Sequence, residues 1–211
     1  MEYVQMPLGP LQTNCYLLIN EKKSCLIFDP GEEGEKVIKL VEQNGLKPLA
    51  IMLTHAHFDH IGAVDTVRNH FQIPVYLHED EADWLENPVL NGSRFFIPNQ
   101  VITVNQADYL LKGEEQLNIG DFSFSIFETP GHSPGSVSYY FEDAHLVVSG
   151  DALFQGSIGR TDLSGGNHEQ LIHSIHKKLL TLPEETLVLS GHGPITTISQ
   201  EMDTNPFLNG F

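Results

Sequence analysis

The run Thr54-His55-Ala56-His57-Phe58-Asp59-His60 constrains this chain more than any other part of its sequence. It places three histidines and one aspartate within six positions, directly after the apolar stretch Ala50–Leu53. Imidazole and carboxylate groups are the ligands that Zn²⁺ and similar divalent metals prefer. The donors form two pairs, His55 with His57 and Asp59 with His60. The run therefore predicts a site for two metal ions at the end of a buried strand, and a solvated polar loop is the alternative.

The composition limits the possible partners. The chain has 211 residues, of which 40% are apolar, enough for one domain with a buried core. Its formal net charge of −17 argues against nucleic acid, which needs clustered basic residues. We expect no secretory signal, and the sequence has no apolar run of the roughly 18 to 20 residues that a membrane span needs. We expect one cytoplasmic domain over 1–211, either a monomer or a small homo-oligomer, that binds a small molecule and no membrane.

The two cysteines, Cys15 and Cys25, lie in consecutive predicted strands. Two cysteines do not make a disulfide framework, so we expect both to be reduced, with a single disulfide as the alternative.

Apolar runs separated by turn residues predict strands throughout the chain. In the first half they cover 15–19, 24–28, 49–53 and 75–78. In the second half they cover 117–119, 122–127, 137–141, 145–149 and 186–190. Helical spacing appears at 35–44, 61–70 and 168–180, the last with Asn167 as its N-cap, and 87–100 predicts a loop on the substrate side. This alternation favours an α/β fold of two sheets with helices on their outer faces.

Three later predicted strands also end at a glycine beside a potential ligand. The ligands are His132, Asp151 and His192. Loops after strand ends form the functional crevice of layered α/β folds, and glycine permits a tight exit from the strand. One glycine–histidine pair would mean little, but four strand ends that all supply histidine or aspartate predict one metal centre.

In this order the motifs resemble those of the metallo-β-lactamase superfamily. The matching positions are Asp29, His55-x-His57-x-Asp59-His60, His132, Asp151 and His192. The segments 131–136 and 150–162 are similar to the glyoxalase II-type branch, and 205–211 is similar to the ending of short bacterial members. The resemblance covers nearly the whole chain. It implies a four-layer αβ/βα sandwich of two mixed β-sheets flanked by helices.

The resemblance also implies a ligand set for two divalent metal ions. His55, His57 and His132 would bind the first ion, and Asp59, His60 and His192 the second, with Asp151 bridging both. Asp59 and Asp151 would be the catalytic carboxylates. Zn²⁺ is the expected metal, with Fe or Mn²⁺ as alternatives. Asp29 would orient a ligand histidine, or else serve only as a turn residue before Pro30.

The chain departs from larger glyoxalase II enzymes in its substrate contacts. Few residues follow His192, so we expect no separate C-terminal helical domain for glutathione. Arg160 stands where those enzymes have a substrate-contacting lysine, and Asp162 and Gly193-Pro194 stand where they have tyrosines. Arg160 is expected either to bind a substrate carboxylate or to form an ion pair with Asp162 or Asp151.

The leading functional prediction is a hydrolase of small thioesters such as S-lactoyl-thiols. The alternatives are an Fe-dependent persulfide dioxygenase, a lactone or phosphoester hydrolase, and a metal-bearing module without turnover. β-Lactamase activity is not expected, because the later motifs follow the glyoxalase pattern. Phe95 and Phe96 would line the substrate pocket or anchor their loop. The remaining histidines are expected on solvated or satisfied positions: His70, His78, His145, His168, His173 and His176.

Overall fold

The computed structural model describes residues 1–208, so that the last three residues of the closing segment 205–211 lie outside the described part. The chain divides into two compact units. The first comprises Met1–Leu111 and the turn Ile119–Phe122, and the second comprises Lys112–Asn118 and the chain from Ser123 onward. The single domain expected over 1–211 stays a prediction.

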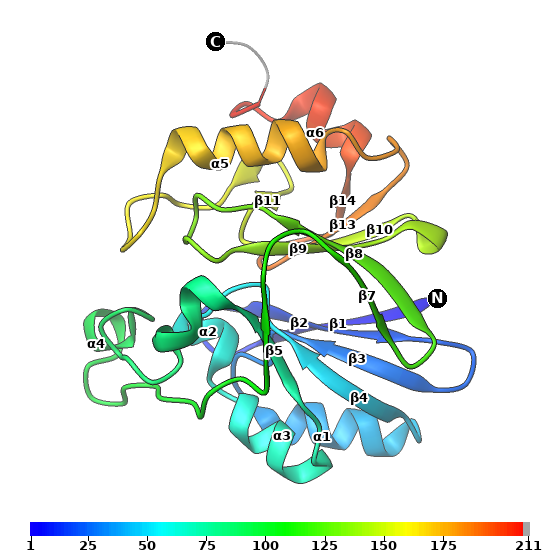
Figure 1. The fold of residues 1–211 in the computed structure, drawn as a ribbon, viewed down its shortest axis with the longest axis vertical. Helices are drawn as coiled ribbons and strands as arrows, with labels where there is room; N and C mark the ends of the chain where they lie inside the picture. Colours follow the sequence, from blue (N-terminus) through cyan, green and yellow to red (C-terminus); the bar gives the residue numbers. More distant parts are fainter. Residues whose placement is uncertain (209–211) are drawn as a thin grey trace. The chain divides into compact units, whose positions relative to one another are not determined.

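A six-stranded mixed sheet forms the centre of the first unit (Figure 1). Its strands, in spatial order, are β1 (Glu2–Leu8), β2 (Thr13–Ile19), β3 (Ser24–Phe28), β4 (Lys47–Met52), β5 (Val75–His78) and β6 (Tyr109–Leu111). β1 to β3 pair antiparallel, and β3 to β6 pair parallel. The carboxyl ends of β3 and β4 therefore lie side by side at the same end of the sheet, where Phe28 is opposite Met52.

Helices cover one face of this sheet. Figure 1 shows α1 (Gly34–Gln43) and α3 (Val64–Phe71) along the same face. The apolar residues of these helices recur at helical spacing and join the core with the strands. The shorter elements of the unit are α2 (Phe58–Ile61), a 3₁₀ helix (Glu79–Trp84) and α4 (Ser93–Phe96).

A second six-stranded mixed sheet forms the centre of the second unit. Its strands, in spatial order, are β14 (Thr196–Thr197), β13 (Leu187–Ser190), β10 (Leu146–Gly150), β9 (Val137–Phe141), β8 (Phe122–Glu128) and β7 (Gln116–Ile119). β10 and β13 pair parallel, whereas β9 pairs antiparallel with both β8 and β10. β11 (Leu153–Phe154) and β12 (Ser157–Ile158) form a separate antiparallel hairpin.

The helices of the second unit pack on its sheet through apolar side chains. They are α5 (His168–Ser174), which continues as a π-helical turn (Ile175–Leu179), and α6 (Ile198–Thr204). A separate 3₁₀ turn (Glu142–Ala144) lies between β9 and β10. Leu171, Ile175 and Leu179 are fully buried beside Val147 and Val188 of the strands. The Asn167 side chain accepts a hydrogen bond from the Gln170 amide and caps α5 as expected.

The observed elements differ from the sequence prediction at several places, among them α4 and β1. The segment 87–100, predicted as a loop, contains the short helix α4, which starts after Gly92 at φ 87°. The Asn91 side chain stabilises this start by accepting the Ser93 amide at 3.0 Å. β1 was not expected from the sequence, because it pairs only with β2 at the sheet edge and half of it is exposed, so its pattern does not alternate cleanly.

Among residues 1–208, no helix combines the length and the apolar character that crossing a membrane would require.

Candidate metal centre

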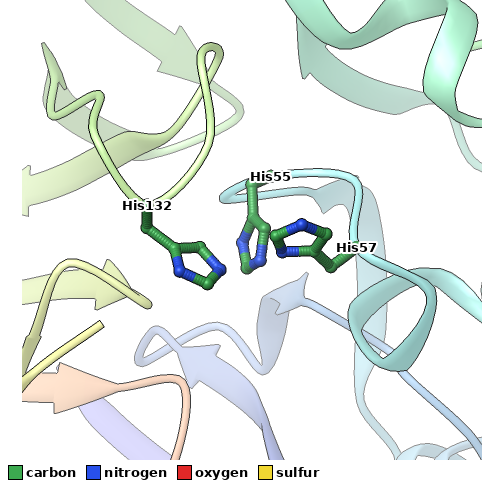
Figure 2. Close-up of side chains that lie close together, drawn as sticks. All are labelled: His55, His57 and His132. Carbon is green, nitrogen blue, oxygen red and sulfur yellow. The ribbon is translucent and has the colours of Figure 1, made fainter. Parts of the chain in front are cut away.

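The first group of predicted ligands lies in the first unit, immediately after β4. The loop between β4 and α2 carries His55 and His57, whose side chains are drawn in Figure 2. Asp59 and His60 follow within α2. The ring centroid of His55 lies 4.8 Å from that of His57 and 4.1 Å from that of His60. All four side chains belong to buried residues, so the fold gathers the donors of the run away from bulk water.

Asp29 orients two imidazoles of this group. It follows β3 with φ 46°, and its Oδ1 accepts the Thr54 amide at 2.8 Å. Its Oδ2 accepts the Thr54 hydroxyl at 2.6 Å and lies 3.0 Å from Nδ1 of His60. Because a carboxylate only accepts, Nδ1 of His60 carries a proton, and in the neutral imidazole the lone pair is then on Nε2.

Thr54 links Asp29 to His55 and sets the tautomer of the His55 ring in the same way. Its single hydroxyl proton goes to Asp29, so its oxygen accepts from Nδ1 of His55 at 3.0 Å. A ligand histidine in metal sites donates its other ring nitrogen to an oxygen in this way, which sets the tautomer and the ring orientation. Asp29 therefore occupies a turn with positive φ and also holds the Thr54 and His60 side chains by hydrogen bonds, and its role beside a metal ligand stays a prediction.

Two further side chains support the loop and were missed by the sequence analysis. The Thr13 hydroxyl donates to Oδ2 of Asp59 at 2.7 Å. The carboxylate of Glu81, which is fully buried, accepts the Ala56 amide between His55 and His57. Glu81 is one of several acidic residues in the 3₁₀ helix, and only its burial in the fold distinguishes it from the others.

A close backbone approach explains the glycine after Asp29-Pro30. A Cβ on Gly31 would overlap the carbonyl of Asp59, and a Cβ on Gly62 would overlap the carbonyl of Gly31. Glycine allows such an approach at the cost of conformational entropy. The two glycines thus let the turn after β3 press against α2 and hold Asp29 within reach of His60.

The second group of predicted ligands lies in the second unit, after three of its strands. His132 follows β8, Asp151 follows β10 and His192 follows β13. Oδ2 of Asp151 lies 3.5 Å from Nε2 of His132 and 3.5 Å from Nε2 of His192. Both imidazoles thus present the same ring nitrogen to one carboxylate oxygen. His132 and Asp151 are buried, whereas the His192 side chain is 29% exposed.

The β11–β12 hairpin sets the orientation of His132. Nδ1 of His132 lies 2.8 Å from the carbonyl oxygen of Arg160, directly after the hairpin. A carbonyl only accepts, so this ring too has its lone pair on Nε2. A Cβ on Gly159 would overlap the Asp151 carbonyl and lie 3.2 Å from Nδ1 of His132. Glycine at this position lets the backbone come close to both candidate ligands.

The guanidinium group of Arg160 is paired with Asp162. Nε donates to Oδ1 at 2.7 Å, and Nη2 donates to Oδ2 at 2.9 Å, a two-pronged geometry that arginine favours with carboxylates. The hydrogen bonds from Arg160 lower the pKa of Asp162 to about 2, and Asp162 raises the pKa of Arg160. Of the alternatives for Arg160, the structure contains the ion pair with Asp162, and the contact with a substrate stays a prediction.

The donor chemistry of both groups fits divalent metal ions. The candidates comprise imidazoles and carboxylates only, in buried or half-buried positions. Three imidazoles have their Nδ1 hydrogen bonds directed to oxygen atoms of Thr54, Asp29 and Arg160. The other histidines behave as expected: His70 pairs with Glu42 on the surface, and the buried His78 accepts the Asp80 amide.

Comparison with known proteins identifies the family. The model of the Metallo-beta-lactamase superfamily matches residues 8–192. The chain is 37% identical over 205 residues to the hydroxyacylglutathione hydrolase GloC of Haemophilus influenzae, with 97% of this chain and 96% of that protein covered.

Two solved structures show the same fold at high identity. BLEG-1 B3 metallo-beta-lactamase superposes with a TM-score of 0.97 at 59% identity, covering 99% of this chain and 100% of that one. TTHA1623 in a di-iron-bound form superposes with a TM-score of 0.86 at 42% identity, covering 97% of this chain and 100% of that one. The predicted α/β sandwich of two mixed sheets flanked by helices is thereby confirmed as the fold class.

Proposed function

Because the chain belongs to the metallo-beta-lactamase superfamily, we propose that it is a dinuclear metal-dependent hydrolase of small thioesters, S-lactoyl-thiols first. The observation that carries the proposal is the orientation of His55, His60 and His132 by oxygen acceptors at Nδ1. A solvated polar loop has no reason to set three imidazole tautomers alike, whereas a metal site requires it.

We propose that the two groups of donors act on the same pair of ions. In the assignment that the family resemblance implies, His55, His57 and His132 would bind one ion and Asp59, His60 and His192 the other, with Asp151 shared by both. Zn²⁺ is the first choice, and the di-iron form of TTHA1623 supports Fe as an alternative alongside Mn²⁺. When bound, two such ions supply a hydroxide at neutral pH and polarise a carbonyl group.

The protein's own residues prepare the site for this chemistry. Asp29 and Thr54 hold the imidazoles of His60 and His55 in one tautomer, so no reorientation is needed when a substrate arrives. Thr13 fixes Oδ2 of Asp59. A thioester suits such a site because its thiolate leaving group departs without a general acid, and no further acidic residue is assigned to the reaction.

The thioester substrate is supported by the relative GloC, a hydroxyacylglutathione hydrolase. The glyoxalase-like segments 131–136 and 150–162 point in the same direction. The similarity to BLEG-1, a B3 metallo-beta-lactamase, makes β-lactam hydrolysis the second candidate, although the later motifs do not favour it. Persulfide oxidation and lactone or phosphoester hydrolysis remain alternatives on the same donors. A cytoplasmic location and a monomer or small homo-oligomer stay predictions.

The test is the release of free thiol from S-D-lactoylglutathione by protein of measured metal content. The control is the double variant His55→Ala/Asp151→Ala, which removes one donor from each unit. We expect thiol release by the wild type only, with two metal ions per chain. Turnover of a chromogenic cephalosporin without thioester turnover would favour the β-lactamase instead, and oxygen consumption with a persulfide and one Fe per chain would favour the dioxygenase.

A further inference from the structure

An exposed aromatic and cationic surface lies beside the metal-ligand run in the first unit. It consists of Arg94, Phe95 and Phe96, three of the four residues of α4, and we call it the α4 surface. Phe95 is 69% exposed and Phe96 is 48% exposed, and Arg94 is also exposed. Exposed aromatic rings next to a charged group are typical of a binding surface, because they otherwise leave apolar area in water.

The α4 surface is attached to the residue between two proposed ligands. Phe58 stands between His57 and Asp59, and its ring stacks on Phe96 with centroids 5.7 Å apart and an interplanar angle of 22°. The Phe58 amide also donates to the carbonyl of Asn91 at 3.0 Å. These contacts place α4 at the ligand end of the sheet within the first unit.

Buried polar contacts hold the segment in one conformation. Asn91 is fully buried, and its Nδ2 donates to the carbonyls of Trp84 and Ile102 at 3.1 and 3.0 Å. Ser93 is also fully buried, and its hydroxyl oxygen accepts the Ile102 amide at 3.0 Å. The α4 side chains are therefore exposed on a fixed backbone, which lowers the entropy lost when a ligand binds.

Arg94 is an exposed cation on α4, whose Phe96 ring stacks on Phe58 of the ligand run. Among residues 1–208, no carboxylate forms an ion pair with it. Lys22, Lys23 and Lys47 lie where β3 and β4 begin, at the opposite edge from the ligand loops. Arg68 is held by Asp108 at 2.6 Å.

Arg160, the cation that the sequence indicated as a substrate contact, donates two hydrogen bonds from its guanidinium group to the carboxylate of Asp162. With a net charge of −17, the protein repels anions unless a local cation attracts them.

We propose that the α4 surface is the specificity element for the carrier part of the thioester, and that the carrier thiol bears a carboxylate. Arg94 binds that carboxylate, and Phe95 and Phe96 cover the adjoining apolar part of the carrier. The inference rests on the proposed thioesterase function and adds the chemical class of the thiol.

The test compares two thioesters that share the lactoyl group. S-D-lactoylglutathione carries carboxylates on its thiol, and S-D-lactoyl-N-acetylcysteamine carries none. The measured quantity is kcat/KM for S-D-lactoylglutathione divided by kcat/KM for S-D-lactoyl-N-acetylcysteamine. This ratio cancels any general loss of activity. We expect Arg94→Gln to lower this ratio about tenfold and Arg94→Lys to lower it less, because lysine keeps the charge without the forked geometry.

The matched control is Lys39→Gln, which removes another exposed cation, on α1, and is expected to leave the ratio unchanged. An unchanged ratio in Arg94→Gln, or an equal fall in both variants, would overturn the inference.

A second readout separates this inference from the proposed function. Binding of glutathione to each protein is measured by calorimetric titration, which does not need turnover. If the wild type hydrolyses neither thioester, the proposed function fails. The inference then stands only if glutathione binds the wild type at least about tenfold more tightly than Arg94→Gln. Equal binding, or none by the wild type, would overturn it.

Discussion

The two groups of candidate ligands are built in different ways. In the first unit, four donors come from one run of six residues, and side chains from β2, the turn after β3 and a 3₁₀ helix hold them. In the second unit, three donors come from three separate strand ends, and a backbone carbonyl holds one of them. The first group therefore depends on buried acceptor side chains, whereas the second depends on how strands and a hairpin bring distant loops together.

The largest effects are expected from the ligands themselves, and they differ between the groups. His55→Ala removes a fully buried imidazole, so we expect kcat for thioester hydrolysis to fall by about 10³-fold or more. The His192 side chain is 29% exposed, so water can replace it, and His192→Ala is expected to cost about 10²-fold. Steady-state kinetics and metal analysis measure both, with His168→Ala on α5 as the control. Equal losses would show that the exposure of a ligand does not matter here.

The second unit depends on a buried carboxylate away from its ligands. Glu201 is fully buried, and it accepts hydrogen bonds from the Gly156 amide, the Thr196 hydroxyl and the Asn205 amide. Glu201→Ala leaves these three donors unsatisfied, so we expect the free energy of unfolding to fall by about 3 kcal/mol. Chemical denaturation measures it, with the exposed Asp203→Ala on the same helix as the control. A change below about 1 kcal/mol would mean that water replaces the carboxylate.

A third pair of variants tests whether the imidazole of a candidate ligand is oriented by a side chain, as in His60, or by the backbone, as in His132. Asp29→Asn weakens the acceptor for His60 and Thr54, so we expect metal affinity to fall about 10- to 100-fold with the fold retained. Arg160→Ala keeps the carbonyl that orients His132, so metal affinity should change by less than about threefold. Competition with a chelator measures both. Similar affinities for the two variants would contradict the difference drawn between the groups.

The smallest effect concerns the two thiols, which both lie in the first unit. Burial raises the pKa of Cys25 to about 12 and also raises that of Cys15. The unfolded chain releases these protons near pH 8.5, whereas the folded chain keeps them, so the free energy of unfolding should fall as the pH rises above that value. We expect a loss of about 1 kcal/mol per thiol and pH unit above pH 9.

The measurement is denaturation between pH 7 and 10, with Cys15→Ala/Cys25→Ala as the control. In the native protein at pH 8, both thiols should also resist a disulfide exchange reagent until the first unit opens. Rapid labelling of either thiol in the native state would refute this.

Features that depend on local chemistry could be predicted from the sequence. The run from His55 to His60 predicts metal binding by its composition alone, and the strands around it follow from continuous apolar residues. An exposed edge strand such as β1 and a one-turn helix such as α4 depend on their neighbours rather than on their own pattern, so the sequence did not predict them. It also missed Thr13 and Glu81, whose roles follow from contacts over 46 and 25 residues of separation.

The sequence by itself determined the residue types of the candidate ligands, their order along the chain and the family of the chain, because motif spacing is a property of the primary structure. Only the tertiary structure decided which acceptors set the imidazole tautomers. A hydrogen bond such as Asp29 to His60 requires the carboxyl ends of two parallel strands to meet. The tertiary structure also decided that Arg160 is held by Asp162, whereas Arg94 is exposed on α4, whose Phe96 ring stacks on Phe58, since the pairing of a charge depends on its neighbours in space.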